Sequence, residues 1–222
     1  PINSIVRISL DSPAGTRPEV LVSGADFYSN ARINSSGTKL TWLQWNHPLM
    51  PWDGCELWVA DFGKEGIQNS RRLAGGNTEA VFQPEWHPKD EDALFYVSDR
   101  TGWWNLHSID TGTENACPEP VLPMEAEFGT PMWVFGMKTY QFSSSETIVC
   151  TYTSDSRWHL GHINIKSKKL SRIGLPYTEY SSINCSEGVA AFKAGSPESS
   201  PAVISFNIST KEHIKISKPS AD

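Results

Sequence analysis

Segments rich in tryptophan and β-branched residues recur along this chain, and polar turns separate them. Clear examples are residues 42–59, 94–106 and 148–161, each of which combines apolar runs with Gly, Pro, Asn, Asp or Ser. No segment of about twelve residues shows the i, i+3, i+4, i+7 apolar spacing of an amphipathic helix. Strand-forming runs bounded by such turns predict an all-β chain.

The strand-and-turn units align as four repeats of similar length. The repeats cover residues 29–75, 81–122, 130–176 and 180–217. Residues 1–24 form a half unit, with two strand-like runs around a polar loop. A period of roughly 40 to 50 residues is typical of one four-stranded blade of a β-propeller. We therefore predict that residues 1–222 form a single partial β-propeller of about four blades plus a half blade.

A partial propeller has unpaired strand edges, and such edges favour pairing with another chain. The blade count therefore favours either a truncated piece of a longer propeller or a homo-oligomer that covers its open edges.

The charge and the cysteines argue against several classes of function. A net charge of −6 and an isoelectric point near 5.5 disfavour a phosphate-binding surface, so we expect no nucleic-acid partner. No C-x-x-C pair occurs, which predicts no metal and no other cofactor.

The sequence shows no signal peptide and no apolar run of bilayer length, so we expect no membrane partner. The sparse cysteines favour a reducing compartment, and we expect a cytoplasmic location. The four cysteines are Cys55, Cys117, Cys150 and Cys185.

The common catalytic motifs do not occur in the sequence. There is no G-x-S-x-G nucleophile elbow, no phosphate-binding P-loop and no G-x-G-x-x-G. His159 and His162 lie in a strand-like run, and their spacing places them on opposite faces of a strand. We therefore predict no catalytic residue in this chain itself.

A turn is predicted at residues 99–102, where Gly102 supplies the freedom for a positive φ. The two residues that follow, Trp103 and Trp104, are predicted to point to opposite faces of the next strand.

Several of these segments together resemble the propeller of the prolyl oligopeptidase family of serine peptidases, and most closely its acylaminoacyl-peptidase and dipeptidyl-peptidase branches. The resemblance extends over residues 26–211. The segments that carry it are residues 45–58, 82–86, 98–106 and 123–136.

The resemblance implies a division of labour. Members of the family join an N-terminal propeller to a C-terminal α/β-hydrolase domain with a Ser-Asp-His triad. No α/β-hydrolase domain is present in these 222 residues, so no catalytic residue can be assigned. The resemblance implies that the propeller gates and selects peptide substrates and docks the hydrolase domain.

Two loops supply the candidate substrate-binding residues. Glu125 and Glu127 lie two apart in a connection between repeats, so in an extended segment both carboxylates face the same way. Together they are able to hold the cationic amino terminus of a peptide. The long loop at residues 46–53 carries His47 and Trp52, whose apolar surfaces are suited to lining a substrate cavity. The alternatives are solvated acids in the first loop and packing between blades in the second.

Two other functions stay open. One is a stand-alone propeller that binds a protein or peptide and has no enzymatic activity. The other is a propeller lyase or glycosidase, which needs inward-facing acids on several inner strands, and the repeats show no such recurring acid. A reading frame that continues past Asp222 into a hydrolase domain favours the peptidase, and a stop codon there favours the binding module.

Overall fold

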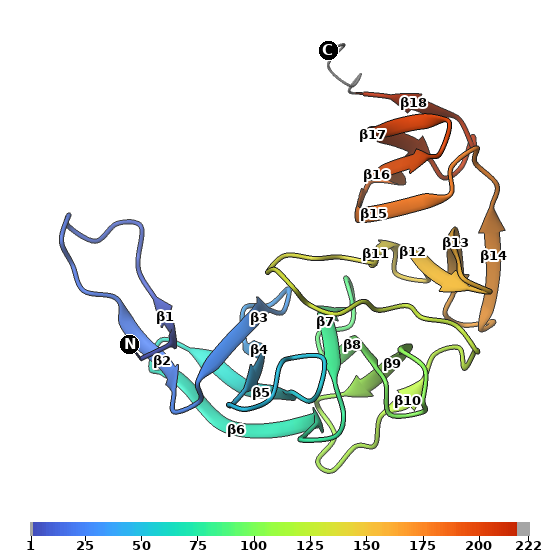
Figure 1. Ribbon diagram of the computed structural model, residues 1–222. Coiled ribbons are helices and arrows are strands. Elements are labelled where there is room, and N and C mark those ends of the chain that lie inside the picture. Colours follow the sequence, from blue (N-terminus) through green and yellow to red (C-terminus); the bar gives the residue numbers. More distant parts are fainter. Residues whose placement is uncertain (1, 217–222) are drawn as a thin grey trace.

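The computed structural model describes residues 2–216, and these residues form strands, turns and loops without a helix. None of them therefore supplies a helix that could span a membrane. The strands of the described chain form one two-stranded sheet and four four-stranded sheets, all antiparallel. The sheets follow one another in a crescent (Figure 1). The predicted all-β partial propeller with four blades and a half blade is confirmed.

Each sheet is a run of consecutive strands. The half blade contains β1 (Ser4–Arg7) and β2 (Glu19–Ser23). Blade 1 contains β3 (Phe27–Ile33), β4 (Lys39–Trp45), β5 (Glu56–Gly63) and β6 (Gly66–Gly75). Blade 2 contains β7 (Val81–Trp86), β8 (Ala93–Ser98), β9 (Asn105–Asp110) and β10 (Glu119–Pro120). Blade 3 contains β11 (Tyr140–Ser144), β12 (Thr147–Ser154), β13 (Arg157–Asn164) and β14 (Lys169–Ile173). Blade 4 contains β15 (Glu179–Ser186), β16 (Val189–Ser196), β17 (Ser199–Asn207) and β18 (His213–Lys215).

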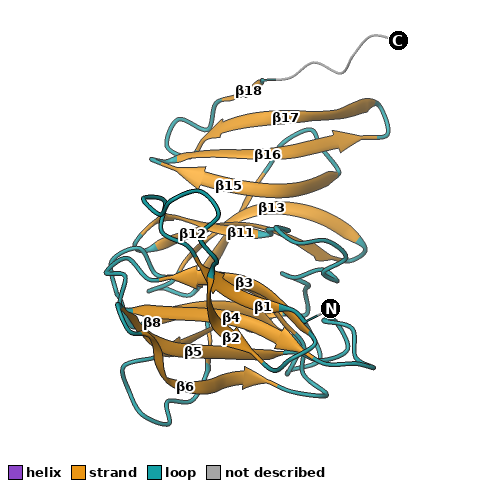
Figure 2. Cartoon of the chain, turned by 90° about the vertical axis from the view of Figure 1, so that its left-hand side faces the viewer, coloured by secondary structure: helices purple, strands orange, loops and turns teal. Residues whose placement is uncertain are grey.

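The blades stack face to face, as the side view in Figure 2 shows. The first strand of each blade is the inner one, because β3 lies against β7, and β11 against β15. Apolar side chains fill the interfaces between blades, which we call seams. One large core joins blades 1, 2 and 3, a second joins blades 3 and 4, and a third joins the half blade to blade 1.

Every inner strand carries one residue more than the strand beside it. The register shifts by one residue within β3, β7, β11 and β15. In three of them a residue other than glycine adopts a positive φ at this bulge: Asn30 at 52°, Gln83 at 48° and Ser182 at 57°. Because one extra residue moves all later side chains to the opposite face, each bulge re-aims the residues that follow it in its strand.

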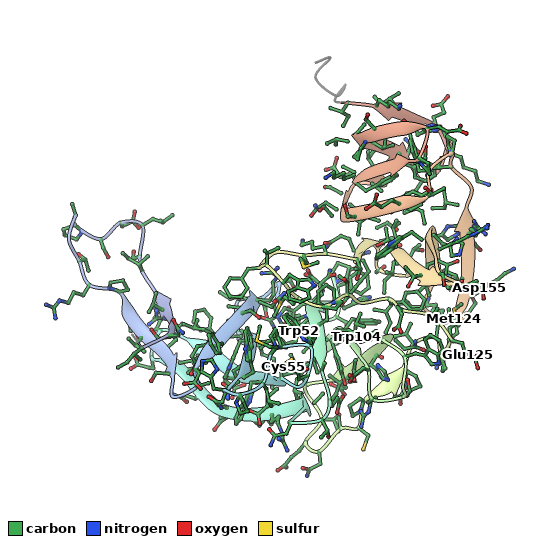
Figure 3. The ribbon with its side chains drawn as sticks, in the orientation of Figure 1. Trp52, Cys55, Trp104, Met124, Glu125 and Asp155 are labelled. Atoms are coloured by element: carbon green, nitrogen blue, oxygen red, sulfur yellow. The ribbon has the colours of Figure 1, made fainter. Side chains whose placement is uncertain are left out.

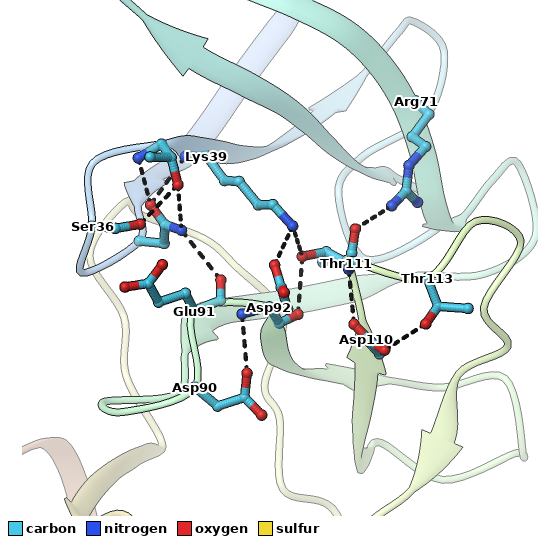
Figure 4. A network of polar contacts seen from close by, with 12 residues as sticks. Ser36, Lys39, Arg71, Asp90, Glu91, Asp92, Asp110, Thr111 and Thr113 are labelled. Atoms are coloured by element: carbon cyan, nitrogen blue, oxygen red, sulfur yellow. Dashed lines mark hydrogen bonds and ion pairs between the residues drawn. The ribbon is translucent and has the colours of Figure 1, made fainter.

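Polar contacts reinforce the seam between blades 1 and 2 (Figure 4). The ammonium of Lys39 pairs with Asp92 and donates a hydrogen bond of 3.0 Å to Oγ1 of Thr111. The guanidinium of Arg71 donates to the Thr111 carbonyl over 2.6 Å, and the amide of Asn34 donates to the Glu91 carbonyl over 3.2 Å. Side chains of blade 1 thus bind both the side chains and the backbone of blade 2.

The turn at residues 99–102 has the predicted conformation, whereas the strand predicted after it starts later. Gly102 has a φ of 86°, and its N–H donates to the Asp99 carbonyl. The prediction that Trp103 and Trp104 belong to one strand is wrong, because β9 begins at Asn105. The backbone of Trp104 is instead engaged by the connection that leads to blade 3.

Candidate functional site

A row of polar side chains crosses the inner strands of all four blades. We call this row the polar belt, and it consists of Arg32 on β3, Glu85 on β7, Lys138 before β11, Gln141 on β11 and Asn184 on β15. Nε of Arg32 and Nζ of Lys138 lie 3.8 Å from the two carboxylate oxygens of Glu85. Nζ of Lys138 also donates to Gln141 over 3.2 Å and to Asn184 over 3.3 Å.

The bulges explain why the belt forms. Arg32, Glu85 and Asn184 are each the first residue back in register after the bulge of their strand. The repeated bulge therefore brings equivalent positions of three blades to one level. Two cations share one carboxylate, so the belt carries an excess of positive charge along the inner strands.

Glu85 is the most confined charged group of the belt, with a side chain 11% exposed. Its hydrogen bond with Nε2 of Gln83 is long, at 3.5 Å. The two cations lie farther away, each at 3.8 Å, beyond hydrogen-bond distance. A carboxylate with such loose partners retains the capacity to accept a closer donor from a ligand.

An exposed apolar loop leads into β11. Trp133, Val134 and Phe135 are 71%, 64% and 69% exposed, and we call these three residues the apolar loop. The ring of Trp133 lies against the ring of Trp52, with 4.2 Å between the centroids. The two long connections at residues 46–53 and 130–139 therefore meet.

His47 is held in the first of these connections by contacts with blade 1. Its ring lies edge-on to Phe27 with centroids 4.9 Å apart, and its backbone N–H donates to Asp26 over 2.9 Å. It borders a cavity of about 340 Å³ together with Trp45 and Cys55. Burial raises the pKa of the Cys55 thiol to about 12, so that this thiol stays protonated and does not act as a nucleophile near neutral pH.

Glu125 and Glu127 lie in the connection between blades 2 and 3, but their surroundings differ. Oε2 of Glu127 accepts a hydrogen bond of 2.7 Å from the Trp104 N–H, and the Glu127 backbone pairs with Thr153. Glu125 is exposed. Figure 3 shows Glu125 at one edge of the crescent and Trp52 near its middle. The structure thus brings Trp52 to the apolar loop and keeps Glu125 well apart from it.

None of the belt residues was among the predicted substrate-binding residues. Glu85 lies in the segment 82–86 that carries part of the family resemblance, but its side chain was given no role, and Lys138 reads as an isolated lysine. The signal that could reveal them is positional: Arg32, Glu85 and Asn184 occupy equivalent places in their repeats. No group of three or more metal-ligating side chains comes together among residues 2–216.

Comparisons with known proteins were made at the level of sequence and of structure. Neither a family model nor a curated protein sequence matches the chain. Among solved structures, a puromycin-hydrolysing peptidase of Mycobacterium tuberculosis is 28% identical with a TM-score of 0.89, over 97% of this chain and 33% of that one. A puromycin hydrolase is 31% identical with a TM-score of 0.83, over 92% of this chain and 31% of that one.

A more distant structure has the same fold. One prolyl endopeptidase structure has a TM-score of 0.72 at 12% identity, over 96% of this chain and 30% of that one. The chain spans about a third of the length of all three of these structures. In fold, and over nearly its whole length, the chain therefore matches the N-terminal propeller of the prolyl oligopeptidase family.

Proposed function

We propose that this chain is the non-catalytic propeller part of a prolyl-oligopeptidase-type serine peptidase, where it selects peptide substrates and docks the hydrolase domain. The observation that carries the proposal is the apolar loop, Trp133, Val134 and Phe135, held against Trp52. Contiguous exposed apolar surface of this kind marks an interaction site, because leaving it in water is unfavourable. The two puromycin-hydrolysing relatives support a partner of peptide-like chemistry.

The polar belt supports the selection role. A peptide that passes along the inner strands meets Arg32, Glu85 and Lys138, so both its charged termini and its side chains find a partner. We propose that the belt and the apolar loop together form the surface along which peptides reach the hydrolase domain. Glu125 and Glu127 stay candidates for holding a peptide amine, and Glu127 has its Oε1 available for this.

The reading frame past Asp222 provides the first test. We expect it to encode a hydrolase domain with a G-x-S-x-G elbow. In that longer protein, Trp133→Ala and Phe135→Ala should each raise KM for peptides by about tenfold, because each removes a large apolar contact. Ile214→Ala is the matched control, since Ile214 is comparably exposed on blade 4. A stop codon directly after Asp222, or an unchanged KM in both loop variants, contradicts the proposal.

The second candidate function is a stand-alone propeller that binds a peptide or protein. The apolar loop favours it equally, since an interaction surface serves a binding module as well as a peptidase. A stop codon after Asp222, combined with peptide binding that Trp133→Ala abolishes, would establish it.

We also propose the cytoplasmic location predicted from the cysteine pattern.

A further inference from the structure

A cavity of about 140 Å³ lies where the inner strands of blades 3 and 4 meet. Lys138 of the polar belt is part of its lining. Thr130 and Met137, which flank the apolar loop on either side, line it as well. Strands β12 and β13 of blade 3 and β15 of blade 4 form the other walls. The cavity therefore adjoins both the polar belt and the connection that carries the apolar loop.

Two rings from different blades contribute to these walls. Val149 on β12 and Leu160 on β13 are buried in the core that joins blades 3 and 4. Thr151 comes two residues after Val149, so it faces blade 4 as well. Trp158 comes two residues before Leu160 and packs against the same core. Tyr180 on β15 belongs to this core and lines the cavity from blade 4.

The buried polar side chains of the lining already have partners within the fold. Oγ1 of Thr139 donates to the Phe128 carbonyl over 2.6 Å, and Oγ1 of Thr151 donates to the Thr139 carbonyl over 3.3 Å. The Tyr180 hydroxyl donates to the Tyr177 carbonyl over 3.1 Å. A guest in this part of the cavity has no unpaired polar group to satisfy, so the walls favour an apolar one.

The volume of the cavity limits the size of its guest. An apolar cavity of about 150 Å³ inside a protein is large enough to bind one benzene molecule. A cavity of about 140 Å³ therefore holds one group of that size, such as the side chain of leucine or phenylalanine. Ser181 and Ser182 line the cavity and are exposed, so that it reaches the surface at the bulge of β15.

We propose that this cavity is a subsite for one apolar side chain of a bound peptide, with leucine or phenylalanine as the largest side chain that fits. The peptide backbone follows the polar belt past Lys138, and the side chain enters the seam between Trp158 and Tyr180. The inference rests on the proposed function, because it needs a peptide bound along the belt, and it adds which residue of the peptide is selected.

The probes are four pentapeptides that have glycine at every position except the central one, which is glycine, leucine, phenylalanine or tryptophan. Calorimetry measures their binding to the chain. The leucine and phenylalanine peptides should bind about tenfold more tightly than the all-glycine peptide, because each buries an apolar side chain. The tryptophan peptide should bind more weakly than the phenylalanine peptide, because its ring is too large for the cavity.

The indole N–H signals of the nine tryptophans, followed by NMR, locate the bound peptide. The phenylalanine peptide should shift the signal of Trp158, which the variant Trp158→Phe assigns. The signal of Trp133 reports separately on the apolar loop. A shift at Trp133 without one at Trp158 would overturn the subsite and leave the proposed function intact. No shift at either tryptophan would overturn both.

A cavity-filling variant tests the assignment of the residues. Thr151→Leu should remove the preference for phenylalanine over glycine, because the larger side chain occupies the cavity. The Thr139 carbonyl keeps its bond to the Thr151 N–H in this variant. Thr147→Leu is the matched control, since Thr147 lies on the same face of β12 and lines a second, larger cavity of the same seam.

Equal effects of these two variants on the preference would overturn the subsite. Equal binding of the phenylalanine and all-glycine peptides to the unmodified chain would overturn it too. That comparison needs no variant, so the proposal stays testable even where Thr151→Leu does not fold.

Discussion

The seam between blades 2 and 3 and the seam between blades 3 and 4 are built from different side chains. Large aromatic rings fill the first: Phe95 and Phe142 meet edge to face at 5.0 Å, and Phe82 lies against Trp104 at 6.2 Å. In the second, small residues (Ala190, Ala194 and Ala202) are buried beside the aromatic rings of Phe192 and Phe206. A cavity of about 580 Å³ and the smaller one of about 140 Å³ both lie in the second seam.

This difference shows that a propeller does not need equally tight seams to hold its blades in order. The first seam is closed by rings and by Gln83, a buried side chain of β7 that bonds to the backbone of β11. The second seam leaves space between the blades. The contacts are thus closer between blades 2 and 3, and the open space lies next to blade 4.

The largest expected effect contrasts one phenylalanine in each seam. Phe82 and Phe206 are both 1% exposed. Phe82→Ala should lower the free energy of unfolding by about 4–5 kcal/mol, because the closed seam cannot collapse into the space left behind. Phe206→Ala should cost about 3 kcal/mol, since Phe206 already borders a cavity. Urea denaturation measures both, and equal losses would contradict the contrast.

Gln83→Leu should lower the free energy of unfolding by about 2–4 kcal/mol, because it leaves two buried backbone groups without a partner. Nε2 of Gln83 donates to the Tyr140 carbonyl over 2.6 Å, and Oε1 accepts the Thr139 N–H over 2.7 Å. Gln141→Leu is the matched control, because Gln141 is only partly buried and its side chain accepts from Lys138 instead of bonding to the backbone. Denaturation curves of the two variants should differ clearly, and similar midpoints would refute this role for Gln83.

Two glycines give effects of opposite sign. A Cβ added at Gly129 would lie 2.3 Å from the Trp104 ring, so Gly129→Ala should destabilise the chain by about 1–3 kcal/mol. A Cβ at Gly174, beside the large cavity, meets no atom within 4 Å. Gly174→Ala should therefore stabilise the chain by about 0.4–1 kcal/mol, through the reduced entropy of the unfolded state. Thermal unfolding measures both variants. A shift of the two melting temperatures in the same direction would contradict the predicted difference between Gly129 and Gly174.

The smallest expected effect is on the response to acid. Burial lowers the pKa of His107 in blade 2 and of His162 at the open seam. The folded state therefore binds protons less readily than the unfolded state, whose histidine pKa is near 6.5. These histidines therefore do not reduce the free energy of unfolding above pH 6.5. Below it, the free energy of unfolding falls as the pH drops toward their lowered pKa values in the folded state. His107→Gln and His162→Gln should each flatten this fall, as followed by urea midpoints between about pH 7 and pH 5. A double variant with the original pH slope would exclude both histidines.

Much of the fold could be predicted from the sequence because turns and aromatic strands repeat at blade spacing. The turn at Gly102 followed from the conformational freedom of glycine. The polar belt could not be predicted, because the bulge at Gln83 changes which face Glu85 occupies, and a period of two does not reveal an extra residue. The contact between Trp52 and Trp133 joins loops of different blades, and local patterns do not encode such pairs. The strand predicted at Trp103 and Trp104 was displaced by the connection that holds Trp104 through Glu127.

The extra residue in each inner strand also has a consequence for how such a protein changes over time. Up to the bulge, the alternation of a strand is set by the packing of its blade, while beyond it the alternation is offset by one. Substitutions at positions such as 32, 85 and 184 can therefore alter what the inner strands display while the alternation that packs the seams is kept. When a blade with this bulge is duplicated, the residue after the bulge can change without altering the side chains that pack the seam.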